Sequence, residues 1–136
     1  MIDEKKQKTP ALAIGPMANV IVPVTDQDRA IAFYVEKLGF EKRADVPFGN
    51  GDRWVEVAPP GSQAAISLAP PRHALPTGSN PTCISFEVDD VDATHAILRA
   101  RGVDVDPEVL RAPPPVPPMF FLRDPDRNAL LIVARR

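Results

Sequence analysis

Hydrophobic and polar positions change period in a regular order along the first half of the chain. Residues 19–24, NVIVPV, are apolar at nearly every position, which predicts a strand packed on both faces. Asp26 can cap a following helix, in which apolar residues recur at helical spacing until Gly39 ends it. Three further strands are predicted at the stretches FEKRADVPF, RWVEVA and AAISLA.

The second half of the chain repeats this order of elements. The stretch CISFEV predicts a strand, Asp90 a helix cap, and Gly102 the end of the helix. Helical spacing places four residues on the predicted buried face of that helix: Ala93, Ala96, Ile97 and Ala100. The stretches VDVDPEVL, MFFLR and ALLIVA predict three more strands.

A constant offset relates the two halves. A shift of 64 residues carries VTDQD onto VDDVD, Asn19 onto Cys83, and Ser67 onto Leu131. Each unit has a one-sided sheet that cannot bury both of its faces alone. Two such units together can therefore enclose a shared core or cavity.

These patterns resemble the vicinal oxygen chelate superfamily, which includes glyoxalase I, bleomycin-resistance proteins and extradiol dioxygenases. The resemblance is carried by VTDQDRAIAFYVEKLGF, FEVDDVDATHAILRARGV and FLRDPDRNALLIV. It implies an α+β fold in which two paired βαβββ modules form a curved, open mixed-sheet cup with the helices on the convex side. We expect one domain, with module one at about 17–70, module two at about 82–134 and a flexible segment at 1–14. It also implies a homodimer.

In the superfamily's metal enzymes, four ligands, usually His and Glu, lie on the concave face. The resemblance assigns these four positions to Asn19, Ser67, Cys83 and Leu131. Leucine has no ligand atom, and a neutral amide and hydroxyl bind divalent ions weakly without carboxylate support. We therefore expect no metal and no other cofactor.

The remaining metal-binding and nucleophilic residue types do not change this expectation. His73 lies in the loop PPRHALP, and His95 lies in mid-helix outside the predicted buried face, so both are expected in solvent. Cys83 has no predicted base or cation beside it to generate a thiolate, so it is expected to be a small buried residue.

Alternation along the strands predicts which residues face the cup. Their small and apolar character, with one aromatic platform and a few polar groups, suits an organic ligand. The predicted pocket residues are Asn19, Ile21, Trp54, Glu56, Ser67, Cys83, Ser85, Phe121 and Leu131. Glu56 could bind a cationic ligand or act as a base, or it could pair across the sheet with Arg43 or Arg53.

Composition excludes two classes of partner. The 136 residues carry 16 basic and 18 acidic side chains, a net charge of −2, and the basic ones are scattered, so no nucleic-acid surface is expected. No apolar run approaches the roughly 20 residues that cross a bilayer, so no membrane partner is expected. The single cysteine and the polar N-terminus favour a cytoplasmic protein.

Three functions remain open from the sequence. The leading hypothesis is a metal-independent binding protein that holds a small organic molecule in the cup. The alternative is a metal-dependent isomerase, lyase or dioxygenase of the same superfamily with displaced ligands. A third is a structural or regulatory module without a ligand.

Overall fold

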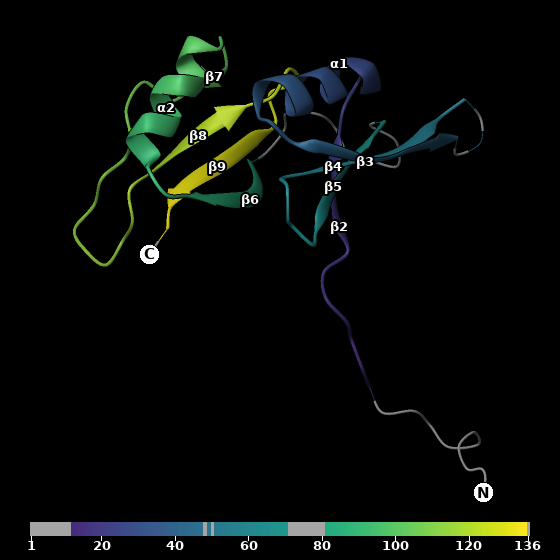
Figure 1. The fold of residues 1–136 in the computed structure, drawn as a ribbon, viewed down its shortest axis with the longest axis horizontal. Coiled ribbons are helices and arrows are strands. Elements are labelled where there is room, and N and C mark those ends of the chain that lie inside the picture. The colour runs from purple at the N-terminus through teal and green to yellow at the C-terminus, as the bar shows by residue number, and fades with distance from the viewer. Residues whose placement is uncertain (1–11, 48, 50, 71–80, 136) are drawn as a thin grey trace, which may run out of the picture.

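The computed structural model describes residues 12–47, 49, 51–70 and 81–135, and these form two four-stranded mixed sheets (Figure 1). The first sheet has the order β2 (Asn19–Pro23), β5 (Ala65–Ala69), β4 (Arg53–Ala58), β3 (Glu41–Pro47). The second has the order β6 (Pro81–Val88), β9 (Ala129–Ala134), β8 (Met119–Arg123), β7 (Asp104–Val105). In each sheet the first two strands are parallel and the others antiparallel, which confirms the predicted α+β fold of two βαβββ modules.

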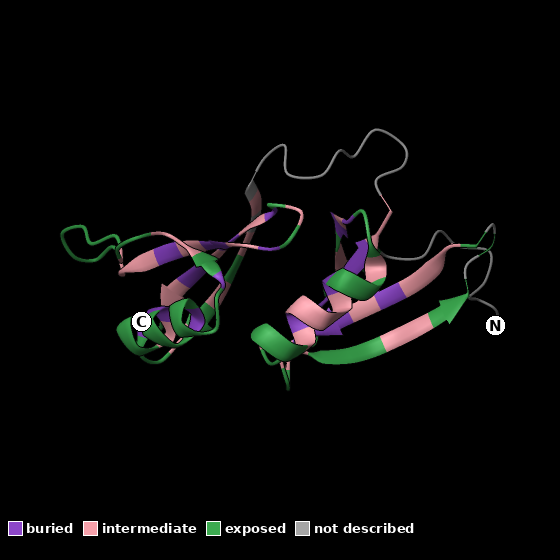
Figure 2. Cartoon of the chain, turned by 90° about the horizontal axis from the view of Figure 1, so that it is seen from above, coloured by how far each residue is buried: buried purple, intermediate pink, exposed green. Residues whose placement is uncertain are grey.

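Each module has one helical segment against a face of its own sheet (Figures 1 and 2). In module one, α1 (Gln27–Ala32) continues as the π-helix η1 (Phe33–Lys37); in module two the helix is α2 (Val91–Ala100). The predicted caps are confirmed, because Asp26 accepts the Arg29 N–H and Asp90 accepts the Ala93 N–H. No helix in the described part of the chain is long and apolar enough to cross a membrane.

Strand pairing confirms the offset between the modules. Ile21 lies opposite Ser67 in module one, and Ser85 lies opposite Leu131 in module two. Ser85 follows Ile21 by 64 residues and Leu131 follows Ser67 by 64 residues, so Ser67 and Leu131 occupy equivalent positions. The next strand differs by one residue, since Glu56 faces Ser67 whereas Phe121 faces Leu131.

The buried face of α2 is not the predicted one. Val91, His95 and Leu98 are buried, whereas Ile97 is 50% exposed and the alanines at 93, 96 and 100 are exposed. Small alanines favour a helix equally well in solvent, so their spacing did not report burial.

His95 was predicted in solvent, and that prediction is wrong. Its Nε2 lies 2.6 Å from the Asp106 carbonyl oxygen, and its ring meets the edge of Phe120 with centroids 4.8 Å apart. A hydrogen-bonded imidazole can be buried at little cost, which explains its place in the core.

The stretch VDVDPEVL is a strand only at Asp104–Val105. The Asp106 carboxylate accepts the Phe121 N–H and binds Arg123, so a side chain replaces ladder hydrogen bonds at this point. Pro107 follows, and proline has no N–H to donate to a ladder. Two other predictions, the flexible segment at 1–14 and the solvated His73, fall wholly or mostly outside the described residues.

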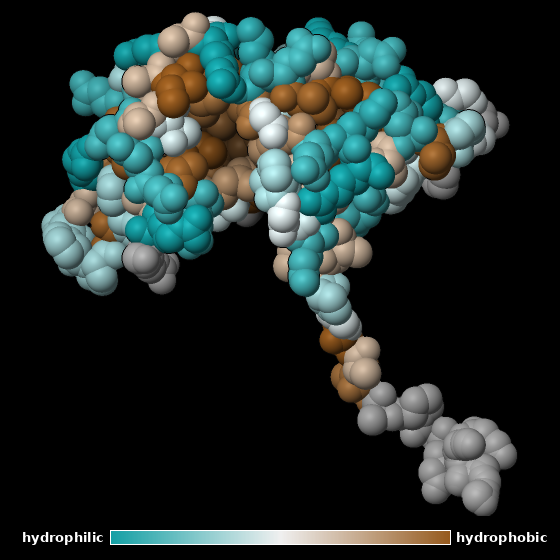
Figure 3. All heavy atoms as spheres, viewed as in Figure 1, coloured by the Kyte–Doolittle hydropathy of each residue, from teal (hydrophilic) through white to brown (hydrophobic). Residues whose placement is uncertain are grey.

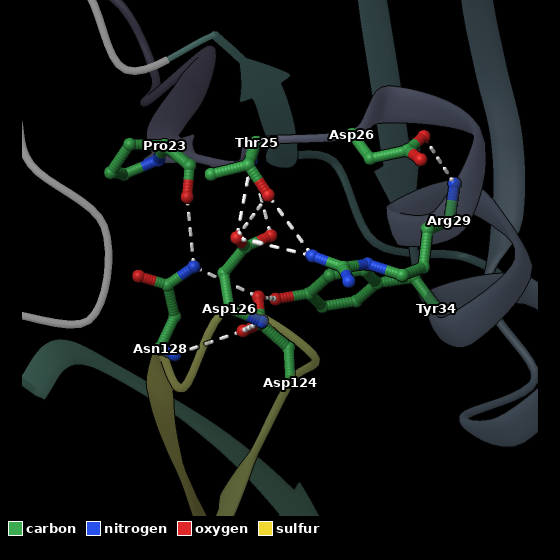
Figure 4. Close-up of polar contacts among 8 residues, drawn as sticks. All are labelled: Pro23, Thr25, Asp26, Arg29, Tyr34, Asp124, Asp126 and Asn128. Carbon is green, nitrogen blue, oxygen red and sulfur yellow. Dashed lines mark hydrogen bonds and ion pairs between the residues drawn. The ribbon is translucent and has the colours of Figure 1, made fainter.

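One buried carboxylate joins the two modules (Figure 4). Asp124, in the turn between β8 and β9, accepts the Tyr34 hydroxyl of η1 at 2.9 Å. It also accepts Asn128 Nδ2 at 2.9 Å, and Asn128 Nδ2 in turn donates to the Pro23 carbonyl at 2.9 Å. We call Tyr34, Asp124 and Asn128 the inter-module lock.

The surface above the lock adds a second group of contacts (Figure 4). Asp126 accepts the Thr25 hydroxyl at 2.6 Å and pairs with Arg29 at 3.4 Å. Its own backbone N–H donates to Asp124 Oδ1, as does that of Asn128, so the turn is ordered around the same carboxylate. The turn of module two is therefore fixed to the start of the helix in module one.

The lock raises the pKa of Tyr34 well above its ordinary value of 10.0. Burial is the largest cause, because it disfavours the phenolate, and the charge of Asp124 and the hydrogen bond to it act in the same direction. The folded state then holds the phenolic proton more tightly than the unfolded state. The free energy of unfolding therefore falls as pH rises above about 10, where only the unfolded state releases this proton.

Tyr34 is the only tyrosine, so its ionisation can be followed directly by phenolate absorbance. We expect no phenolate signal at pH 10 while the protein remains folded. Tyr34→Phe should abolish the pH dependence above about 10 and lower the free energy of unfolding by roughly 1–3 kcal/mol, because Asp124 loses a buried donor. A phenolate signal near pH 10 with native circular dichroism would contradict the lock.

Candidate functional site

The face of each sheet that lies opposite its helix is called the cup face below. On the cup face of module one, Glu56 of β4 accepts two N–H groups at one oxygen. Trp54 Nε1 lies 2.9 Å and Asn19 Nδ2 lies 3.3 Å from Glu56 Oε2. All three side chains are half-buried, so this polar cluster remains open to a ligand.

The two arginines considered as partners of Glu56 have other contacts. Arg53 binds Asp45 and Asp28, each at 2.8 Å, and with Lys42 it lowers the pKa of Asp45 to about 2. Arg43 donates to the carbonyl oxygens of Ser62 and Pro59. Glu56 is thus held by neutral donors, and no ion pair within the described part of the chain compensates its negative charge.

Ser67 forms the floor beneath this cluster. It lies in β5 between Ile21 of β2 and Glu56 of β4, and it is only 2% exposed. Its hydroxyl has no hydrogen-bond partner within the described structure. Ile21, by contrast, is 50% exposed, so an apolar side chain lies in solvent beside a buried hydroxyl.

The predicted pocket residues of module two lie in one row across its sheet. Ser85 is opposite Leu131, and Leu131 is opposite Phe121. Phe120 is buried against His95 of α2, so Phe121 points to the other face, the cup face. The side chain of Cys83 lies outside the described part of the chain.

The modules meet on the helix side. Besides the lock, Lys37 Nζ donates to the Arg101 carbonyl at 2.8 Å and Arg101 Nη1 donates to the Lys37 carbonyl at 2.9 Å. Phe40 and Phe86 contact each other edge to face, with centroids 5.3 Å apart. The structure thus brings together Asn19, Trp54, Glu56 and Ser67, and separately Ser85, Leu131 and Phe121.

A cavity of about 880 Å³ lies between the modules on this helix side, where Figure 3 shows a hollow with hydrophobic walls. We call it the inter-module crevice. Module one contributes Phe40 and Pro59–Ser62, and module two contributes Phe86 and Leu98 among others. Of the predicted pocket residues whose side chains the structure describes, only Ser85 lines it. The sequence analysis did not predict this crevice, because apolar residues such as Phe40 and Phe86 are expected at these positions in any core.

Comparisons with known proteins agree with this geometry. The family model of the Glyoxalase/Bleomycin resistance protein/Dioxygenase superfamily matches residues 16–132. The chain belongs to this superfamily. Among curated proteins, YetH of Bacillus subtilis, described as uncharacterized, is 33% identical over 91 residues, 67% of this chain and 76% of that protein.

Two solved structures share both modules. TnmS3, an antibiotic binding protein from Streptomyces sp. CB03234, is 36% identical with a TM-score of 0.82, over 93% of this chain and all of that one. A superfamily member from Sphaerobacter thermophilus is 31% identical with a TM-score of 0.83, over 91% of this chain and all of that one. These likenesses extend across both βαβββ modules.

The metal that this superfamily often holds does not fit the residues present. At three of the four positions that the resemblance assigns to ligands, Leu131 has no ligand atom, Ser67 offers a neutral hydroxyl, and the Asn19 amide donates to Glu56; the side chain at the fourth, Cys83, is not described. Within the described ranges, no three His, Cys, Asp or Glu side chains lie close enough to hold a metal ion. The donor chemistry favours organic ligands over a metal.

Ser67→Ala tests the cup floor. Removing a buried hydroxyl that lacks a partner removes a desolvation cost, so the free energy of unfolding should stay unchanged or rise by up to about 1–2 kcal/mol. Urea denaturation of the variant and the parent measures this. A decrease of more than about 1 kcal/mol in the free energy of unfolding would mean that the Ser67 hydroxyl already has a hydrogen-bond partner in the protein.

Proposed function

We propose that this protein binds a small organic molecule on its cup face without a metal ion. The observation that carries the proposal is the cluster of Glu56, Asn19 and Trp54. A carboxylate offers about four acceptor sites, so two donors at Oε2 leave Glu56 able to accept a hydrogen bond from a ligand. The half-buried cluster therefore combines a fixed negative charge with an aromatic surface.

The ligand class follows from these side chains. The Trp54 indole and exposed Ile21 offer apolar contact to a ring system, and Glu56 favours a cationic or hydrogen-bond-donating group on it. The likeness to an antibiotic binding protein at 36% identity supports an antibiotic or a similar natural product as the ligand. Sequestration of such a molecule is the role we propose.

A homodimer would complete the cup. The pocket rows of the two modules lie on separate sheets, and the contacts between modules are on the helix side, so a second copy could bring a second row opposite the first. The segment before β2 extends away from the sheets (Figure 1), with Leu12 89% and Ile14 86% exposed. Apolar side chains this exposed support a contact with another copy. The cytoplasmic location stays a prediction from the sequence.

Binding should be measured by calorimetry on chelator-treated protein against a panel of antibiotics and aromatic natural products. We expect saturable binding, and Glu56→Gln should weaken it about tenfold, or about 1.4 kcal/mol, because a charge-assisted hydrogen bond becomes neutral. Glu36→Gln is the matched control, since it removes an exposed carboxylate on the helix side. Its affinity should equal that of the parent.

The metal-dependent enzyme remains the rival for the same experiment. If binding appears only after addition of Mn²⁺, Fe²⁺, Co²⁺, Ni²⁺ or Zn²⁺, the proposal is wrong, and residues at other positions must bind the metal. Equal affinities of the Glu56→Gln variant and the parent would leave the protein a binder but remove Glu56 from its site.

A further inference from the structure

Ser67 places a buried hydroxyl in the middle of the cup face of module one. The residue is 2% exposed, and its hydroxyl has no hydrogen-bond partner within the described structure. Its side chain points to the cup face, because Ile66 and Leu68 on either side of it pack in the hydrophobic core. A hydroxyl that has lost water and gained no partner is costly to bury, so it favours any group that can enter and bind it.

The hydrogen bond between Asn19 and Glu56 passes over Ser67. β5 lies between β2 and β4, and Ser67 of β5 is directly opposite Glu56 of β4. Asn19 of β2 is opposite Ala65, which precedes Ser67 by two residues on the same face of β5. The bond from Asn19 Nδ2 to Glu56 Oε2 must therefore cross β5 above these two small side chains. The Asn19 side chain thus helps to shield the Ser67 hydroxyl from solvent.

This cover can open at little cost. The Asn19–Glu56 bond is 3.3 Å long, beyond the usual range of roughly 2.7–3.2 Å for a bond between an N–H group and an oxygen. Trp54 Nε1 donates to the same carboxylate oxygen at the shorter distance of 2.9 Å. Asn19 is half-buried, so water can replace Glu56 as the partner of its amide. Rotation of the Asn19 side chain therefore uncovers Ser67 while Trp54 continues to hold Glu56.

One ligand atom can reach both Glu56 and Ser67. Directly opposed residues of antiparallel strands have Cβ atoms about 4.5–5.5 Å apart, and these two residues are such a pair. A carboxylate only accepts hydrogen bonds, whereas a serine hydroxyl donates one and accepts others. A ligand hydroxyl can therefore accept the Ser67 proton and donate its own proton to Glu56. An ammonium group has only donors, so it would bind Glu56 and leave the Ser67 proton without an acceptor.

Apolar side chains flank this pair of polar groups. Ile21 of β2 is opposite Ser67 and is 50% exposed. The half-buried Trp54 lies two residues before Glu56 on β4, and the exposed Val46 of β3 is opposite Trp54. An aromatic ring on this surface buries apolar area while its hydroxyl points to Ser67 and Glu56.

We propose that Ser67 determines the specificity of the cup face by selecting ligands with a hydroxyl group on an aromatic ring. This inference rests on the binding function proposed above and narrows its ligand class, because Glu56 alone favours cations and neutral hydrogen-bond donors alike. The ligand oxygen bonds to Ser67 and Glu56 together, and the ring lies on Trp54 and Ile21.

Three quinolines that differ in one substituent test this selection by equilibrium dialysis of the chelator-treated whole protein. 6-Hydroxyquinoline carries the hydroxyl group, 6-methylquinoline replaces it with a methyl group of similar size, and 6-(aminomethyl)quinoline replaces it with a cation. We expect the hydroxy compound to bind at least about tenfold more tightly than either of the others, because each of these leaves a buried polar group unpaired.

Ser67→Ala should lower the affinity for 6-hydroxyquinoline about tenfold and leave that for 6-methylquinoline unchanged, since only the hydroxy compound accepts the serine proton. Ser62→Ala is the matched control, because the Ser62 hydroxyl already donates to the Ala64 carbonyl at 2.9 Å. Its affinities should equal those of the parent. A thermal melt of each variant verifies that a lost affinity does not come from unfolding.

Equal binding of the hydroxy and methyl compounds, or an unchanged affinity of Ser67→Ala for 6-hydroxyquinoline, would overturn the inference. Tighter binding of the aminomethyl compound than of the hydroxy compound would do the same. In these cases a loss of affinity in Glu56→Gln would still support the cup face as a binding site. Absence of binding by all three quinolines also contradicts the inference, and the calorimetric panel then decides the proposed function separately.

Discussion

The buried carboxylate of Asp124 is the contact on which the arrangement of the two modules depends. It gathers the Tyr34 hydroxyl, the Asn128 amide and two backbone N–H groups of its own turn, so the turn of module two is fixed to the helix of module one. A buried carboxylate is stable only with such a set of donors, and each donor is then costly to remove. The rest of the contact between modules, through the helix ends and the Phe40–Phe86 pair, follows the position that this turn sets.

This arrangement divides the surface into two chemically different regions. On the cup face, Glu56 is held by Asn19 and Trp54 above the buried Ser67, which gives a polar cluster on an otherwise apolar floor. On the helix side, the inter-module crevice lies beside the Phe40–Phe86 pair. Among the residues that the structure describes, neither region has three His, Cys, Asp or Glu side chains close enough to hold a metal ion.

Much of the fold could be predicted from the sequence, because the caps at Asp26 and Asp90 are local signals and the same order of elements recurs after 64 residues. The buried face of α2 could not, since the exposed alanines follow helical spacing as well as the buried Val91 and Leu98 do. The lock joins residues 90 positions apart, and nothing local marks Tyr34 as the partner of Asp124. Alternation predicted that Trp54 and Glu56 share a face, but not that the indole would donate to the carboxylate two residues away.

The most direct test of metal-free binding on the cup face is a heteronuclear NMR titration of chelator-treated protein with a ligand found in the calorimetric panel. Trp54 is the only tryptophan, so its indole N–H gives a single resolved resonance, and in the free protein that proton is bonded to Glu56. If the ligand binds on the cup face, we expect this resonance to shift progressively and saturate as the ligand is added, with no metal present. An indole resonance that stays in place while other signals move would place the ligand elsewhere and contradict the assignment of the cup face as the site.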